Sequence, residues 1–249
     1  MSIKDLAPAL PQPRPLVLSA TALFLDLDGT LAPIADRPRD VGPEPRRTAL
    51  LARLETRLEG RLAIISGRTL ADIDRILEGR VTAVAGVHGL VRRHGEADLV
   101  QARVHPQMAR AARGLGAFAA RDPGLMVEDK GLSVALHFRR ASHLADPARA
   151  CARALATQTG LTLQEGDMVT ELRTPGDGKG DSVRAFMATA PFAGATPVFV
   201  GDDATDEDGF AAAQALGGAG ICVGARRPTV ARFRLAGVEA AMTWLEAAR

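Results

Sequence analysis

The sequence predicts an α/β protein with a Rossmann-like parallel-sheet core and an inserted α+β cap domain. Strand and helix signals alternate over most of the chain, which favours a parallel sheet with helices on both faces. In the middle of the chain, pairs of short strands around glycine-containing turns replace that alternation. The 249 residues, 47% of them hydrophobic and 24% charged, suffice for one large core with a smaller insert.

The predicted core consists of short apolar runs that alternate with amphipathic segments. Leu50, Leu54 and Leu58 follow helical spacing. Gly60 stands at the expected end of that helix, and Thr69 is the expected cap of the next one. The predicted strands are residues 22–25, 61–65, 81–85, 196–200 and 220–223. The predicted helices are residues 43–60, 69–77, 207–216 and 238–248.

The middle of the chain has the pattern of two helices and two hairpins. The predicted helices are residues 105–120 and 147–159, and the predicted strands are residues 125–130, 132–138, 161–163 and 168–173. Hairpins imply an antiparallel sheet, which does not belong in the parallel core. Residues 104–174 are therefore predicted to form an α+β cap domain, and residues 21–103 with 175–249 to form the catalytic core. An insert above the carboxyl ends of parallel strands is suited to act as a lid.

The remaining composition excludes several classes of function. Thirty-one basic and 29 acidic residues give a net charge of +2 without a basic face, so no nucleic-acid partner is expected. Cys151 and Cys222 have no metal-site spacing and are interpreted as ordinary thiols. Residues 1–20 are proline-rich at their start and have neither a signal-peptide pattern nor a membrane span. They are predicted to be a flexible leader, and the protein to be cytoplasmic with no membrane partner.

The most informative motif is Asp26-Leu27-Asp28-Gly29-Thr30, at the end of the first predicted strand. Residues two apart on a strand point the same way, so Asp26 and Asp28 can face one pocket. Ligands of open α/β sheets bind at the carboxyl ends of strands, and two adjacent carboxylates favour a divalent cation. The alternative is a solvated turn, which this motif alone does not exclude.

Three further motifs are predicted at separate turns of the same core: Ser66-Gly67-Arg68, Lys179 in a glycine-rich stretch, and Asp202-Asp203 with Asp206. Together with the first motif they supply the groups that phosphoryl transfer needs. Asp26 would be the nucleophile and Asp28 the general acid and base, with Lys179 as the third catalytic residue. Taken singly these motifs are weak, and Lys179 alone would be interpreted as a solvated loop lysine.

The remaining roles follow from the same chemistry. Mg²⁺ is the expected cofactor, held by Asp26, Asp202 and the backbone carbonyl of Asp28. Asp203 and Asp206 are expected to orient those ligands. The expected phosphate-binding residues are Thr30, Ser66, Gly67, Arg68 and Lys179.

These four motifs, in this order, resemble those of the haloacid dehalogenase-like hydrolase superfamily. Leu-Asp-Gly-Thr-Leu-Ala-Pro-Ile at 27–34, Gly-Val-His-Gly at 86–89 and Gly-Asp-Asp-Ala-Thr-Asp-Glu-Asp-Gly-Phe at 201–210 resemble more narrowly the trehalose-6-phosphate phosphatase family. The resemblance implies Mg²⁺-dependent hydrolysis of trehalose 6-phosphate to trehalose and phosphate, through an aspartyl-phosphate on Asp26. It also places a cap domain between the second and third motifs.

The same resemblance implies a sugar-binding set in the cap: Glu128, Lys130, Arg139 and Glu171. For Glu128 and Lys130, which share one strand face, the residues themselves favour a solvated cross-strand salt bridge instead. His88, between two glycines after a strand, either contacts the substrate or caps the turn.

Three other functions remain as alternatives. The first is a related sugar-phosphate phosphatase for sucrose or mannosylglycerate phosphates, the second is a non-catalytic sugar-phosphate sensor, and the third is a phosphomutase. An intact nucleophile beside an acid/base argues against the sensor, because a pure binder has no need of Asp28 next to Asp26. We expect a monomer that acts on a small-molecule substrate, and functional pairing with a separate trehalose-phosphate synthase is left open.

Overall fold

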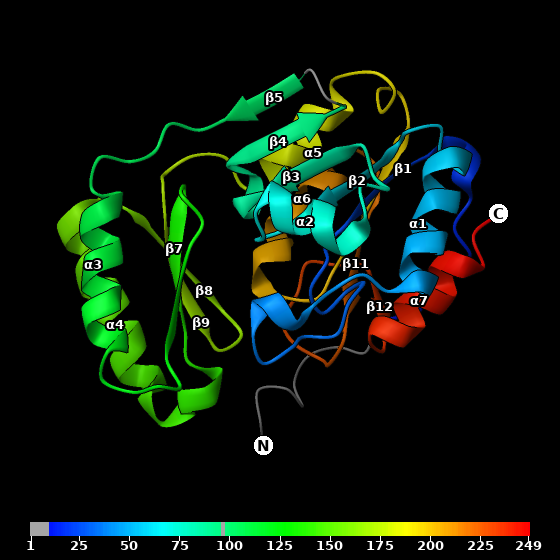
Figure 1. Cartoon of the computed structure of the whole chain (residues 1–249). Helices are drawn as coiled ribbons and strands as arrows, with labels where there is room; N and C mark the ends of the chain where they lie inside the picture. The colour runs from blue at the N-terminus through cyan, green and yellow to red at the C-terminus, as the bar shows by residue number, and fades with distance from the viewer. Residues whose placement is uncertain (1–9, 96–97) are drawn as a thin grey trace. The chain divides into compact units, whose positions relative to one another are not determined.

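A computed structural model describes residues 10–95 and 98–249 (Figure 1). The chain divides into two compact units. The larger unit runs to Val100 and resumes at Asp177–Arg249, and the smaller unit is Gln101–Gly176. No helix in the described part of the chain is long and apolar enough to cross a membrane.

The larger unit is built on an eight-stranded sheet in the order β12-β11-β10-β1-β2-β3-β4-β5. The strands from β12 to β3 pair in parallel and β4 runs antiparallel to β3, so the predicted parallel-sheet core is confirmed. Its strands are β1 (Thr21–Leu25), β2 (Leu62–Ile65), β3 (Ala83–Gly86), β4 (Val91–His94), β5 (Asp98–Gln101), β10 (Thr196–Gly201), β11 (Ala219–Val223) and β12 (Phe233–Leu235).

Five α-helices of the described residues belong to this unit: α1 (Pro45–Arg57), α2 (Leu70–Leu77), α5 (Lys179–Met187), α6 (Glu207–Ala215) and α7 (Val238–Glu246). Thr69 caps α2 as expected, because its hydroxyl accepts a hydrogen bond from the Asp72 N–H at 3.1 Å. The sequence patterns missed β4, β5, β12 and α5. The side chains of β5 are all exposed and those of β4 largely polar, so neither strand has the apolar run that identifies a buried strand.

Helices cover both faces of this sheet, and β1 contributes to both apolar layers. Leu23 and Leu25 belong to the cluster with α1, α2 and α7, whereas Ala22 and Phe24 belong to the cluster with α5 and α6. All five residues of β1 are buried. A strand buried on both faces carries a continuous apolar run rather than an alternating one, which explains why β1 is so clear in the sequence.

The prediction of a flexible leader is wrong for residues 10–20, whereas residues 1–9 lie outside the described part of the chain. Leu16 and Leu18 are buried in the core. The Leu18 N–H donates to the carbonyl of Arg249 at 2.7 Å, and the Arg249 N–H donates to the carbonyl of Leu16 at 2.9 Å. The indole N–H of Trp244 donates to the Arg14 carbonyl at 2.9 Å. The proline content suggested a free leader, but two leucines and the end of the chain hold this segment in place.

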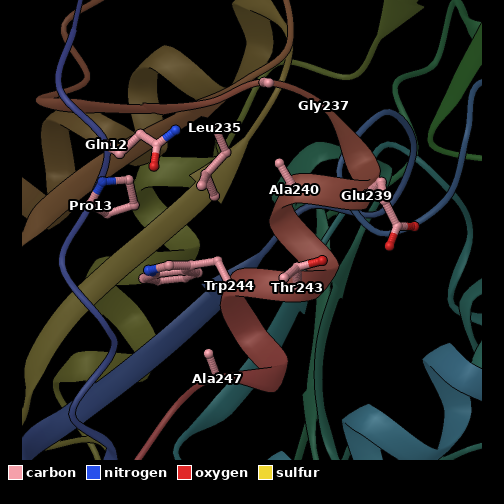
Figure 2. Close-up of a pocket in the computed structure, with 10 residues that line it drawn as sticks. Gln12, Pro13, Leu235, Gly237, Glu239, Ala240, Thr243, Trp244 and Ala247 are labelled. Carbon is pink, nitrogen blue, oxygen red and sulfur yellow. The ribbon is translucent and has the colours of Figure 1, made fainter.

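A pocket of about 680 Å³ lies beside this segment, with α7 along one side (Figure 2). Gln12 and Pro13 line it from the N-terminal segment, and Trp244 lines it from the helix.

The smaller unit contains a four-stranded antiparallel sheet in the order β6-β7-β9-β8. Its elements are α3 (Met108–Ala119), β6 (Met126–Asp129), β7 (Ser133–His137), α4 (Ala145–Thr159), β8 (Thr162–Gly166) and β9 (Val169–Arg173). Both helices pack on one face of the sheet, where Val134, Leu136 and Leu172 contribute to a separate apolar core. Glu128, Ala135 and Glu171 are paired in register, so they form a row on the opposite face.

Candidate active site

The first and last of the four motifs meet because their strands, β1 and β10, are neighbours in the sheet. Asp26 directly follows β1 and Asp202 directly follows β10, and these two strands pair in parallel. The Asp26 N–H donates to the carbonyl of Val200 at 2.9 Å, which continues the ladder one residue past β1. Carboxylate oxygens of Asp26, Asp202 and Asp206 lie within 4.8 Å of one another. The structure therefore brings these three carboxylates together at the carboxyl edge of the sheet.

Lys179 lies among these carboxylates. Its ammonium nitrogen is 2.8 Å from Oδ1 of Asp26 and 2.5 Å from Oδ1 of Asp206. The alternative for Lys179, a solvated loop residue, does not apply, because Lys179 is the buried first residue of α5. Burial lowers the pKa of Lys179, but the charges of Asp206 and Asp26 outweigh that effect and hold its pKa above the usual range. Lys179 is therefore a fixed positive charge beside the predicted nucleophile.

Asp206 uses both carboxylate oxygens to organise the loop after β10. Its Oδ1 accepts from Lys179, and its Oδ2 accepts from the backbone N–H groups of Asp202 and Asp203 at 2.9 and 3.0 Å. The Asp203 carboxylate accepts from the Thr205 N–H at 2.5 Å and caps the short helix Ala204–Asp206. Both residues thus shape the loop that carries Asp202.

Burial and neighbouring carboxylates disfavour the ionised forms of Asp26 and Asp202. Burial raises the pKa of Asp26 well above its usual range, even though the charge of Lys179 opposes that effect. Burial, followed by the charges of Asp206 and Asp203, raises the pKa of Asp202 to about 8. Oδ1 of Asp202 is buried and accepts no hydrogen bond from the residues in 10–95 and 98–249. Hard carboxylate oxygens around an unsatisfied oxygen fit a Mg²⁺ ion.

Asp28 forms an ion pair with Arg68. Its two oxygens accept hydrogen bonds from Arg68, at 2.6 Å from Nε and 2.7 Å from Nη2. Arg68, expected at the phosphate, thus lies with its guanidinium on the predicted acid/base residue. The two aspartates predicted to be catalytic therefore have different partners, an ammonium for Asp26 and a bidentate guanidinium for Asp28.

Other predicted phosphate-binding residues lie at the ends of β1 and β2. The hydroxyl of Thr30 is buried and has no hydrogen-bond partner among the described residues. Ser66 is buried directly after β2, and its carbonyl accepts from the His88 N–H at 2.9 Å. A Cβ atom at Gly67 would lie 2.5 Å from Cε1 of the His88 ring. Because only glycine leaves room for that ring, Gly67 and His88 are brought into contact within the larger unit.

In the smaller unit, Lys130 joins two carboxylates of the predicted sugar site. Its Nζ is 2.9 Å from Oε2 of Glu171 and 4.0 Å from Oε2 of Glu128. The ion pair with Glu171 is buried, with side-chain exposures of 7% and 5%. The salt bridge between Glu128 and Lys130 that the sheet pattern suggested is also present, but with side-chain exposures of 22% and 7% it is largely shielded from solvent. Nε2 of His137 lies 2.8 Å from the same oxygen of Glu128. Arg139 is not part of this cluster, since it donates to Oδ2 of Asp167 at 2.8 Å.

The sequence interpretation missed three residues that support these sites. His137 is one of them, and its alternation with Ala135 on β7 could have indicated it. Asp208 accepts from the Gly180 N–H at 2.8 Å and so ties α6 to the start of α5. Arg227 donates to the carbonyls of Asp202 at 3.1 Å and Asp203 at 2.7 Å, and also contacts Glu207. No local pattern around Arg227 indicates that it reaches this loop.

Comparisons with known proteins agree on one family. Residues 24–239 match the family described as trehalose-phosphatase. The chain is 40% identical over 230 residues to trehalose-6-phosphate phosphatase of Escherichia coli strain K12, covering 90% of this chain and 85% of that protein. It is 36% identical over 210 residues to a probable trehalose-phosphate phosphatase of Sinorhizobium fredii, covering 82% and 77%.

A solved structure supports the fold. The C-terminal domain of trehalose-6-phosphate phosphatase from C. albicans superposes with a TM-score of 0.83 at 21% identity, covering 95% of this chain and 97% of that one.

Proposed function

Because the chain belongs to the trehalose-phosphatase family, it is a phosphatase, and we propose that it hydrolyses trehalose 6-phosphate to trehalose and phosphate. The observation that carries the proposal is the contact between Lys179 and Asp26 at the carboxyl edge of the sheet. A buried carboxylate beside a fixed ammonium is suited to attack phosphorus once a bound cation supplies further positive charge. Asp28, two residues on, is available for proton transfer.

The proposed reaction has two steps. In the first, an oxygen of Asp26 forms a bond to phosphorus, the bond from phosphorus to the sugar oxygen breaks, and Asp28 gives that oxygen a proton. In the second, Asp28 takes a proton from a water molecule whose oxygen attacks phosphorus, and the bond from phosphorus to Asp26 breaks. Phosphate leaves and Asp26 is restored. One carboxyl group thus serves as acid and then as base.

Mg²⁺ is the proposed cofactor, and the unsatisfied Oδ1 of Asp202 supports it. Asp26, Asp202 and the backbone carbonyl of Asp28 would hold the ion, which supplies positive charge between the nucleophile and the phosphoryl oxygens. Asp203 and Asp206 would orient these ligands, and the hydrogen bonds from the Asp202 loop to Asp206 support that role.

The proposed phosphate site combines fixed charge with uncharged donors. Lys179 supplies the charge, and Thr30, Ser66 and Gly67 supply hydroxyl and backbone groups. The buried hydroxyl of Thr30, which has no hydrogen-bond partner among the described residues, supports this assignment.

We propose that residues 104–174 are a cap domain and that residues 21–103 with 175–249 are the catalytic core, with Glu128, Lys130 and Glu171 as the sugar-binding residues. A buried cluster of both charge signs offers donors and acceptors for several hydroxyl groups. Arg139 is left out of this proposal because its guanidinium is paired with Asp167.

The decisive experiment measures phosphate release from trehalose 6-phosphate, sucrose 6-phosphate and glucose 6-phosphate, with Mg²⁺ or with chelator. Release from trehalose 6-phosphate alone, abolished by chelator and by Asp26→Asn, is the expected result. Release from another sugar phosphate would retain the mechanism and change the substrate. Tight binding without release would favour a sensor.

A second experiment tests the sugar site. Glu171→Gln should lose most activity on trehalose 6-phosphate and keep activity on p-nitrophenyl phosphate, which has no sugar. Arg139→Met is the matched control in the same unit and should resemble wild type on both substrates. Equal loss on both substrates for Glu171→Gln would refute the assignment.

A further inference from the structure

We propose that Arg68 is a positioning residue for Asp28 and does not bind the phosphoryl group of the substrate. The inference rests on the proposed function of the same site. It assigns to Arg68 a different role from the one that its place in the Ser-Gly-Arg motif suggested.

The contact between the two residues occupies both oxygens of Asp28. Nε of Arg68 donates to Oδ2 at 2.6 Å, and Nη2 donates to Oδ1 at 2.7 Å. This parallel, bidentate arrangement fixes the plane of a carboxylate as well as its distance. Asp28 sits where β1 has already ended, and a short side chain in a turn has several rotamers to choose from. Arg68 therefore selects one direction for the Asp28 carboxylate.

Both the backbone and the guanidinium of Arg68 are hydrogen-bonded to other residues, so the position of the guanidinium is fixed. Its Nη1 donates to the carbonyl of Pro38 at 2.8 Å. Its backbone N–H donates to the Ser66 hydroxyl at 3.3 Å, and its carbonyl accepts from the Val87 N–H at 2.8 Å. The side chain is 8% exposed, whereas that of Asp28 is 33% exposed. When the pair opens for proton transfer, Asp28 is the side chain with room to move.

The two aspartates of the first motif, Asp26 and Asp28, each bind a different cationic side chain. Lys179 binds Asp26, and Arg68 binds Asp28. The Arg68 guanidinium uses each of its three nitrogens to donate to a protein group, with Nε and Nη2 on one carboxylate and Nη1 on a backbone carbonyl, so three of its five N–H donors are bound to protein. The phosphoryl oxygens would then be bound by Lys179 and the uncharged donors, and Arg68 would act on the reaction through Asp28.

The test compares leaving groups. The oxygen that leaves trehalose 6-phosphate needs a proton, whereas p-nitrophenolate leaves without one. Arg68→Met should lower kcat on trehalose 6-phosphate by about 10- to 100-fold, a part of what a general acid contributes. KM and inhibition by inorganic phosphate should stay near wild type. The first-turnover burst of p-nitrophenolate should also stay near wild type, because Asp28 acts on p-nitrophenyl phosphate only as the base of the second step. In an Asp28→Asn background, Arg68→Met should have no further effect.

Arg75→Met is the matched control, because Arg75 also donates to a carbonyl of the segment before α1, that of Val41 at 3.1 Å. It should leave all these constants unchanged. If Arg68→Met does not fold, Arg68→Lys keeps the charge and loses the bidentate contact. It should show the same selective fall in kcat.

The opposite result would identify Arg68 as a phosphate ligand. KM would then rise on both substrates, inhibition by inorganic phosphate would weaken, and both effects would persist with Asp28→Asn. An Arg68→Met enzyme equal to wild type would also overturn the proposal. If wild type does not hydrolyse trehalose 6-phosphate, the proposed function fails separately. Glycerol 2-phosphate, another alkyl phosphate, then replaces the sugar phosphate in the same comparison.

Discussion

Lys179 and Asp26 are 153 residues apart in sequence, and the ammonium of one lies 2.8 Å from a carboxylate oxygen of the other in the interior of the larger unit. Asp206 completes the group from a third element. The proposed nucleophile, its counter-charge and the residue that hydrogen-bonds the same lysine therefore come from three segments that only the tertiary structure brings together.

Removing the charge of Lys179 should destabilise the fold as well as abolish activity. Lys179→Met leaves Asp26 and Asp206 buried without their cation, a change that costs about 3–5 kcal/mol in the free energy of unfolding. Urea unfolding measures it. Arg184→Met, on the same helix, breaks an exposed pair with Asp181 and should cost about 0–1 kcal/mol. Equal stability of the two variants would contradict the account of Lys179.

Mg²⁺ should stabilise the protein through Asp202. At 100 times its Kd, a ligand of the folded state adds about 2.7 kcal/mol, or about 5–10 °C in Tm for a chain of this size. Thermal unfolding with Mg²⁺ and with chelator measures the shift. Asp202→Asn should abolish it. Asp146→Asn, a carboxylate that is 97% exposed in the smaller unit, should retain it. A full shift in Asp202→Asn would rule out Asp202 as a ligand.

Arg227 should affect metal affinity without touching the metal. Its guanidinium holds the carbonyls of Asp202 and Asp203, so Arg227→Met frees the loop that carries the proposed ligand. We expect the Mg²⁺ concentration for half-maximal activity to rise by about 10- to 100-fold. The neighbouring Arg226 is exposed, and Arg226→Met should leave that concentration unchanged. The idea is refuted if the two variants have the same metal dependence.

In the N-terminal segment, Leu18 should contribute to stability and the adjacent Val17 should not. Leu18 is 2% exposed and Val17 is 61% exposed. Leu18→Ala should therefore lower the free energy of unfolding by about 2–5 kcal/mol, as truncation of a buried leucine does. Val17→Ala should have almost no effect. Similar values for both would mean that residues 10–20 do not pack as described.

Glu44 should make the stability of α1 depend on pH. Its carboxylate accepts from the N–H groups of Arg46 and Arg47 at 2.9 and 2.7 Å, and these bonds hold its pKa below the usual value. A lowered pKa in the folded state gives stability that is present above the unfolded pKa and is lost as pH falls through the folded pKa.

Glu44→Gln should thus be less stable than wild type at neutral pH by less than about 1 kcal/mol, because solvent screens this exposed carboxylate, and the difference should shrink in acid. Urea unfolding at pH 7 and pH 3 measures both values. Glu59→Gln, at a side chain that is 79% exposed, is the control. A difference between Glu44→Gln and wild type that grows in acid would contradict the sign.

The sequence alone located the residues that follow buried strands. Asp26 and Asp202 stand directly after apolar runs, and Ser66 does the same after β2. A parallel strand buried on both faces is recognisable from its composition, and the position after it is where α/β sheets bind ligands. The identities of these residues and their common edge could therefore be predicted from local pattern.

The hydrogen-bond partners of the long cationic side chains could not be predicted from local pattern. Nothing near Arg68 indicates that its guanidinium meets Asp28 rather than a phosphate, and nothing near Arg227 indicates that it holds the Asp202 loop. These contacts join residues 40 and 25 positions apart. Long cationic side chains have many rotamers, and which carboxylate or carbonyl they reach depends on the packing of the elements that carry them.

The sequence by itself thus determined the fold class, the strand ends and the carboxylates that stand there, because hydrophobic periodicity and turn residues are local properties. Only the tertiary structure decided that Lys179 begins a helix and meets Asp26, that Arg68 binds Asp28, and that residues 10–20 pack against the core. Each of those results is a choice of partner between distant segments. The strand order of the parallel sheet determines which of these segments are neighbours.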